Sequence, residues 1–169
     1  MIAYCEIPTA RNARYQDPVV IREILAGART IAVVGLSSNV LRPSHFIGFY
    51  LRRHGYRVVP VNPRERDVLG ERSYASLAEI PFAVDVVDVF RDPAAVPEIA
   101  REAARIGAKA LWLQFGVLSD EGASMAERSG LRVVMDRCMK VEHARWMGRM
   151  HWLGFNTGVV TARRSRLEG

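Results

Sequence analysis

No apolar run in this sequence reaches the ~18 residues that a membrane-spanning helix needs, although 49% of the residues are hydrophobic. The first 17 residues also lack the basic stretch followed by an apolar one that is typical of a secretory signal peptide. Two cysteines, Cys5 and Cys138, do not make a disulfide framework. These absences predict a cytoplasmic chain with no membrane partner. Its 169 residues are close to the usual size of one domain.

Lysine is scarce as well. Lys109 and Lys140 are the only two, so arginine carries most of the positive charge behind a net charge of +6. Arginine favours bidentate contacts with phosphate, although a codon bias toward arginine would explain the same composition. A basic chain also suggests a nucleic-acid-binding regulator. No nucleic-acid-binding motif accompanies the arginines, which are spread along the sequence except for Arg163, Arg164 and Arg166, so nucleic acid is not the expected partner.

The sequence shows no clear metal or catalytic constellation. Its four histidines have no metal-ligand spacing with cysteine or paired acids. Asp85 and Asp88 lie three residues apart in one predicted strand, so they point to opposite faces. Cys138 and His143 include a nucleophile and a base, but nothing in the sequence places them together. We therefore expect neither a metal site nor a catalytic site.

Short β-branched runs alternate with segments of helical spacing. The predicted strands cover residues 30–35, 57–61, 84–90, 110–114 and 131–135. The predicted helices between them cover residues 43–54, 92–106 and 119–130. This alternation predicts an α/β fold: a doubly wound, parallel, five-stranded Rossmann-like sheet of strand order 3-2-1-4-5. Ligands of such sheets bind at the carboxyl ends of the strands, beside the first strand.

Three parts are expected along the chain. Residues 1–17 would form an N-terminal arm, residues 18–145 the Rossmann-like domain with a helix at its start, and residues 146–169 a C-terminal extension. The extension contains Trp152 and Phe155 and is too apolar for plain disorder. We expect it to pack on the domain or on a partner chain, and a homodimer would provide such a chain.

The segment after the first predicted strand is the most informative one. Gly35 permits a sharp turn, and the helix that begins near Pro43 presents free backbone N–H groups that attract phosphate. Its polar side chains are those of Ser37, Ser38, Asn39 and Arg42. An ordinary strand-to-helix turn with a Ser or Asn cap is the alternative, but the place beside the first strand favours phosphate binding.

This loop departs from the dinucleotide fingerprint G-x-G-x-x-G, because Ser37 and Val40 stand where it needs its second and third glycines. The end of the second strand carries Asn62-Pro63-Arg64 in place of an acid. Arg64 would suit a ribose phosphate, which both coenzyme A and NADP possess, or it belongs to a solvated charged loop. An NADP-dependent oxidoreductase therefore stands as the alternative function.

Together the motifs resemble the stand-alone CoA-binding proteins that share the Rossmann-like domain of succinyl-CoA synthetase α subunits. The resemblance covers about residues 21–145. It rests on Gly35-Leu-Ser-Ser-Asn39, Arg42-Pro43-Ser44, Gly55-Tyr56, Val61-Asn62-Pro63, Trp112-Leu-Gln114 with Gly116, and Asp136-Arg-Cys-Met-Lys140. It implies a non-catalytic module that binds coenzyme A or an acyl-CoA. The synthetase reaction is not implied, because its phosphorylated histidine lies in another domain.

The same resemblance implies which residues contact the ligand. Those expected at the pyrophosphate are Gly35, Leu36, Ser37, Ser38, Asn39, Arg42, Pro43 and Ser44. Those expected at the adenosine and its 3′-phosphate are Val61, Asn62, Pro63 and Arg64, with Phe90 and Arg91 beside the adenine. Those expected toward the pantetheine are Gln114, Phe115 and Gly116, with Cys138 near the thiol.

Cys138 carries one more expectation. It lies between Arg137 and Lys140, whose charges would lower the thiol pKa if they approached the sulfur. A thiolate there would exchange with CoA disulfide to give a mixed disulfide. The alternative is a buried, inert cysteine.

Overall fold

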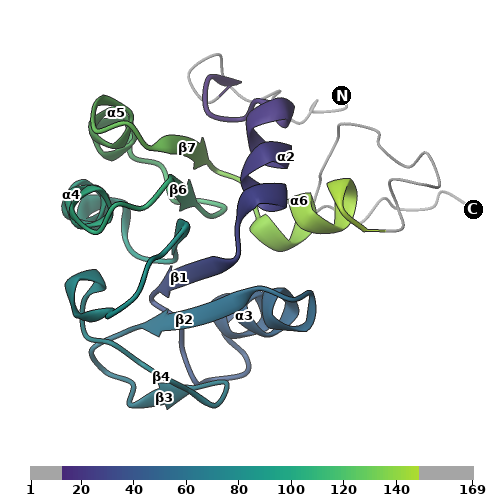
Figure 1. Ribbon diagram of the computed structural model, residues 1–169, viewed down its shortest axis with the longest axis vertical. Coiled ribbons are helices and arrows are strands. Elements are labelled where there is room, and N and C mark those ends of the chain that lie inside the picture. Colours follow the sequence, from purple (N-terminus) through teal and green to yellow (C-terminus); the bar gives the residue numbers. More distant parts are fainter. Residues whose placement is uncertain (1–12, 149–169) are drawn as a thin grey trace, which may run out of the picture.

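The computed structural model describes residues 13–148 of the chain, and its centre is a five-stranded parallel sheet (Figure 1). The strands of this sheet are β1 (Thr30–Val34), β2 (Arg57–Val61), β5 (Val86–Val89), β6 (Ala110–Leu113) and β7 (Arg132–Met135). Two short antiparallel strands, β3 (Asp67–Val68) and β4 (Glu71–Arg72), form a hairpin beside it. The predicted five-stranded Rossmann-like α/β fold is confirmed.

The strand order is β2-β1-β5-β6-β7. When Tyr74, which forms a parallel bridge with Val61 at the outer edge of β2, is counted as the third position, the order runs 3-2-1-4-5 and β7 follows as a sixth position. The run expected as the third strand forms β5 instead, which pairs with the other side of β1. All four residues of β5 are buried, and such a strand belongs in the interior of a parallel sheet.

Helices cover both faces of the sheet (Figure 1). On one face lie α2 (Pro18–Gly27), α3 (Pro43–Arg53) and α6 (Met139–Trp146). On the other lie α4 (Val96–Arg105) and α5 (Asp120–Arg128), with the 3-10 turns η1 (Leu77–Glu79) and η2 (Pro93–Ala95). Within residues 13–148 no helix combines the length and apolar character needed to cross a membrane.

Helix ends follow the local signals of the sequence. The Asp17 carboxylate accepts a hydrogen bond from the Val19 N–H (2.8 Å) at the start of α2. Ser119 Oγ accepts one from Gly122 N–H (3.2 Å) at the start of α5. Gly55, at a φ of 92°, ends α3 in the left-handed conformation that favours glycine. These caps agree with the predicted helix starts near residues 18 and 119 and with the predicted end before Gly55, whereas the predicted helix 92–106 begins with the 3-10 turn η2.

Both edges of the sheet are covered near the carboxyl ends of their strands. At β2, the Tyr74 N–H donates to Pro60 O (3.0 Å) and Tyr74 O accepts from Asn62 N–H (2.9 Å). At β7, Tyr15 O accepts from Met135 N–H (3.1 Å), and the Gln16 amide donates to Met135 O (3.2 Å). Residues of the expected N-terminal arm therefore pack along β7, whereas the expected C-terminal extension lies outside the described residues beyond position 148.

Candidate functional site

A cavity of about 400 Å³ opens where the carboxyl ends of β1, β2 and β5 meet. Its residues come from the β1–α3 loop, the segment after β2 and the end of β5. They are Gly35, Ser37, Arg42, Pro43, Ser44, Asn62, Arg64, Glu65, Phe90 and Arg91. All of them except Glu65 belong to the set expected from the sequence, so the structure places a large part of that set around one opening.

Gly35 brings the three strand ends together. Its φ is 91°, and a Cβ at this position would lie 3.1 Å from Phe90 O and 3.0 Å from Arg91 Cδ. Its N–H donates to Val61 O (2.8 Å). A larger residue would combine backbone strain with a steric conflict against the end of β5.

Hydrogen bonds inside the loop fix its shape. The buried Asn62 side chain donates to Leu36 O (2.9 Å) and so ties the end of β2 to the loop. Ser44 Oγ accepts from Ser37 N–H (3.3 Å). Asn39 Oδ1 accepts a hydrogen bond from the Leu41 N–H (2.9 Å). Leu36 and Asn39 thus shape the loop without lining the cavity.

Glu65 also joins the loop, which the sequence did not predict. Its Oε1 accepts hydrogen bonds from Ser38 N–H (2.9 Å) and Ser37 Oγ (3.2 Å). These bonds, led by the one from the Ser38 backbone, lower the pKa of Glu65 below its ordinary value. The residue stands in the charged run 64–67, for which a solvated loop was the alternative interpretation, and the turn at Asn62-Pro63 was the one local sign that the chain doubles back there.

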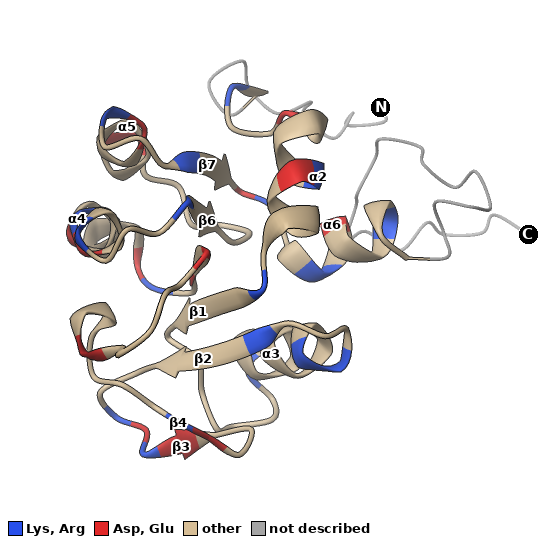
Figure 2. Cartoon of the chain, viewed as in Figure 1, with Lys and Arg blue, Asp and Glu red and all other residues tan. Residues whose placement is uncertain are grey.

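The charge of the cavity suits an anion. Three lining residues are arginines, Arg42, Arg64 and Arg91, and one is an acid, Glu65. The N-terminus of α3 also faces this end of the sheet, and no side chain caps it. Guanidinium groups and a helix N-terminus both stabilise phosphate. Elsewhere basic and acidic residues are interspersed over helices and loops (Figure 2).

A second cavity of about 230 Å³ lies next to the first, and Arg91 lines both. It lies between the end of β2, η1 and α4, and most of its lining is apolar. Val61 and Pro63, two of the expected residues, belong to it, together with Leu77 and Ile99. A flat apolar group could therefore continue from a charged one held in the first cavity.

The remaining expected residues lie at β6 and β7, and none of them lines either cavity. Gln114 is buried, and its amide donates to Asp88 Oδ1 (2.8 Å). Asp88 is fully buried, which raises its pKa to about 7, and its Oδ2 has no hydrogen-bond partner among the described residues. Gly116 donates its N–H to Asp136 Oδ1 (2.9 Å), while the side chain of Phe115 is half-exposed.

Cys138 is the buried cysteine of the alternative interpretation. It is 7% exposed, and burial raises the pKa of its thiol. Arg137 instead donates to Gln16 Oε1 (2.8 Å), and the Lys140 ammonium lies 4.2 Å from the centre of the Phe46 ring. The condition for a lowered pKa is therefore not met, because desolvation outweighs the one favourable charge, that of Lys140.

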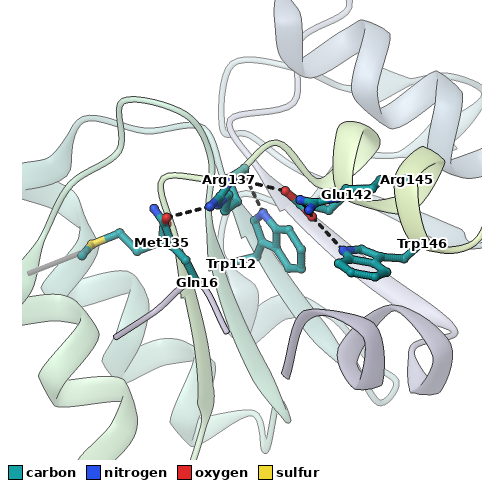
Figure 3. Close-up of polar contacts among 7 residues, drawn as sticks. All are labelled: Gln16, Trp112, Met135, Arg137, Glu142, Arg145 and Trp146. Carbon is teal, nitrogen blue, oxygen red and sulfur yellow. Dashed lines mark hydrogen bonds and ion pairs between the residues drawn. The ribbon is translucent and has the colours of Figure 1, made fainter. Parts of the chain in front are cut away.

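A buried polar network holds the β7–α6 segment (Figure 3). Glu142, 1% exposed, forms ion pairs with Arg137 and Arg145 (3.6 Å each). Trp146 donates its indole N–H to Glu142 Oε2 (2.9 Å). The Trp112 indole N–H donates to Arg137 O (2.6 Å). The segment that carries Cys138 is therefore bound to β6, α6 and the chain before α2.

His143 is surrounded by aromatic side chains. Its Nδ1 shares a hydrogen bond with the Tyr50 hydroxyl (3.1 Å), and its ring packs between those of His54 and Tyr56. Burial lowers the pKa of His143. Among residues 13–148 no three His, Cys, Asp or Glu side chains gather as a metal ion would need.

Comparison with known proteins shows which family the chain matches. The family described as "CoA binding domain" matches residues 29–144. YneT of Bacillus subtilis (strain 168) is 40% identical over 124 residues, which are 73% of this chain and 92% of that protein. A solved protein of Pyrococcus horikoshii OT3 is 37% identical with a TM-score of 0.78, and the match covers 85% of this chain and 99% of that one.

A third relative is larger. Acetate–CoA ligase [ADP-forming] II of Archaeoglobus fulgidus is 28% identical over 129 residues, which are 75% of this chain. The match covers 19% of that protein. This chain therefore corresponds to one part of the ligase.

Proposed function

Because this chain belongs to the CoA binding domain family, we propose that it binds coenzyme A or an acyl-CoA as a non-catalytic module. The observation that carries the proposal is the cavity at the ends of β1, β2 and β5. Its glycine turn, its helix N-terminus and its three arginines are what a pyrophosphate with a further ribose phosphate requires. The match to one part of a ligase supports a module and does not extend the ligase activity to this chain.

Each part of the ligand has a proposed place. The pyrophosphate lies against the Gly35–Ser44 loop, and Arg64 contacts the 3′-phosphate. The adenine enters the second cavity between Pro63 and Arg91. The pantetheine runs outward past the half-exposed Phe115. This last segment lies along the surface, because Gln114 and Cys138 are buried.

Thermal unfolding with added ligands tests the proposal. A ligand that binds only the native state stabilises it by about 2.7 kcal/mol at a hundredfold excess over its Kd. We expect coenzyme A and acetyl-CoA to raise the melting temperature and NAD to leave it unchanged. The glycines that close approach of a dinucleotide requires are absent from the loop.

NADP is the informative competitor, because its 2′-phosphate would also suit Arg64. A larger increase with NADP than with coenzyme A would overturn the proposal and favour an oxidoreductase. No increase with either ligand would also overturn it. Isothermal titration with the same four ligands gives the affinities directly.

A further inference from the structure

The Glu65 carboxylate lies on the donors that a phosphate would use. It accepts hydrogen bonds from Ser38 N–H (2.9 Å) and Ser37 Oγ (3.2 Å), both in the loop that we assign to the pyrophosphate. Carboxylates and phosphates are both anions that bind to such donors. One donor group cannot serve both at full strength, so the two anions compete.

The backbone holds Glu65 in this position. Arg64 N–H donates to Asn62 Oδ1 (3.1 Å) and Glu65 N–H to Asn62 O (3.2 Å), which turns the chain back toward the loop. The Asn62 side chain is itself anchored on Leu36 O (2.9 Å). Glu65 is also the one acid among the residues that line the cavity. A tight turn, and not a freely moving side chain, thus delivers the carboxylate.

We propose that Glu65 sets the affinity of this site for phosphate ligands. Its carboxylate satisfies Ser37 Oγ and Ser38 N–H until a phosphate group displaces it. Displacement costs about the same for every ligand that uses these donors, so Glu65 weakens the binding of each of them by a similar factor. This inference rests on the proposed function, because it assigns a regulating residue to the same cavity.

Calorimetric titration of the full chain with coenzyme A and with inorganic pyrophosphate tests this role. Wild type is compared with Glu65→Gln and with Glu71→Gln, which removes the same charge from an exposed position on β4 outside the cavity. A hydrogen bond to a charged group changes an equilibrium constant by about tenfold or more. We expect Glu65→Gln to bind both ligands about tenfold more tightly and Glu71→Gln to bind them as wild type does. Glu65→Ala should show the same gain.

The outcomes separate the two proposals. If wild type binds coenzyme A and Glu65→Gln binds it no more tightly than Glu71→Gln, the role of Glu65 is overturned and the proposed function stands. If coenzyme A binds no variant but pyrophosphate binds Glu65→Gln more tightly than wild type, the function fails and the role of Glu65 stands. If neither ligand binds any variant, both fail.

The Ser38 amide of wild type gives a second measurement that needs no variant. Without ligand, its proton resonance should follow the ionisation of Glu65, at a pH below the ordinary glutamate pKa. Saturation with coenzyme A should remove this pH dependence, because the carboxylate has left the amide. A dependence that persists unchanged in the complex would overturn the displacement.

Discussion

The two halves of the sheet's carboxyl edge differ in character. At β1, β2 and β5 the edge opens into two adjacent cavities, a polar one with arginine, serine and asparagine in its lining and a mostly apolar one. At β6 and β7 it is closed, because Gln114 and Cys138 are buried and Arg137 is bound to Glu142 and Gln16. The open half would receive the nucleotide end of the ligand once the Glu65 carboxylate has left Ser37 and Ser38. The closed half offers the thiol end a surface and no cavity.

This difference shows which ligand contacts are preorganised in the folded protein. Preorganised donors cost little to use, whereas a buried group must first be exposed. Affinity should then depend mainly on the nucleotide end and little on what the thiol carries. Coenzyme A and acetyl-CoA are expected to bind with similar strength.

The largest effect expected concerns the buried contact between the two halves, where Asp88 of β5 accepts a hydrogen bond from Gln114 beyond β6. An unfolded aspartate ionises near pH 4, whereas burial raises the pKa of Asp88 to about 7. Between these values the unfolded state binds fewer protons, so the free energy of unfolding falls as the pH rises. We expect Asp88→Asn to gain about 2.5 kcal/mol relative to wild type between about pH 5 and about pH 8, measured by urea unfolding.

Asp85→Asn provides the control from the same segment. Asp85 accepts hydrogen bonds from Lys109 and from the Thr30 N–H, and its pKa is lowered. The stability it contributes is present above the unfolded pKa and lost only below it, so this variant should be destabilised equally at both pH values. If Asp88→Asn also shows no change with pH, Asp88 is solvated and the closed half is open to water.

The next effect concerns the open half and Arg64. Dephospho-CoA lacks the 3′-phosphate, so wild type should bind it more weakly than coenzyme A by about 1.5–3 kcal/mol, the contribution of a charge-assisted contact. Arg64→Ala should remove most of this difference, as measured by calorimetry. Arg66→Ala, which changes a neighbouring arginine outside the cavity, should keep it. If Arg64→Ala still binds coenzyme A more tightly than dephospho-CoA, Arg64 does not contact the 3′-phosphate, and Arg42 or Arg91 would be tested next.

The smallest effect is the reactivity of Cys138, studied in a Cys5→Ser background. Burial and a raised pKa both reduce the amount of accessible thiolate. Iodoacetamide should therefore label the native protein at least about tenfold more slowly than the urea-unfolded protein. CoA disulfide should likewise give no adduct detectable by intact mass. Rapid, reductant-sensitive addition of one CoA would show that the closed half opens and would restore the mixed-disulfide hypothesis.

Much of the fold was predictable because its signals are local. The cap at Asp17, the glycine at Gly55 and the β-branched run at 86–89 each act within a few residues. The place of β5 was not predictable in this way. It depends on which strand pairs with β1 across more than fifty residues, and on the single bridge of Tyr74 that occupies the outer side of β2.

In the candidate site, too, the features set by local sequence could be predicted and those set by distant contacts could not. The loop after Gly35 and the turn at Asn62 could be located from residue type and strand position. Glu65 could not, because its partner Ser38 lies 27 residues away and offers a backbone N–H, which leaves no trace in residue type. For Cys138 the neighbour in sequence was misleading. Arg137 adjoins it in the chain, but its guanidinium is bound to Glu142 and Gln16.

The covered sheet edges restrict how two copies of this chain could associate. An open edge strand invites a second chain to extend the sheet through backbone pairing, which is also a route to aggregation. Here Tyr74 occupies the backbone groups at the end of β2, and Pro60 has no N–H to offer. Tyr15 and Gln16 occupy those at the end of β7. A homodimer of this chain is therefore expected to join through helix or loop surfaces, with each copy keeping its own sheet.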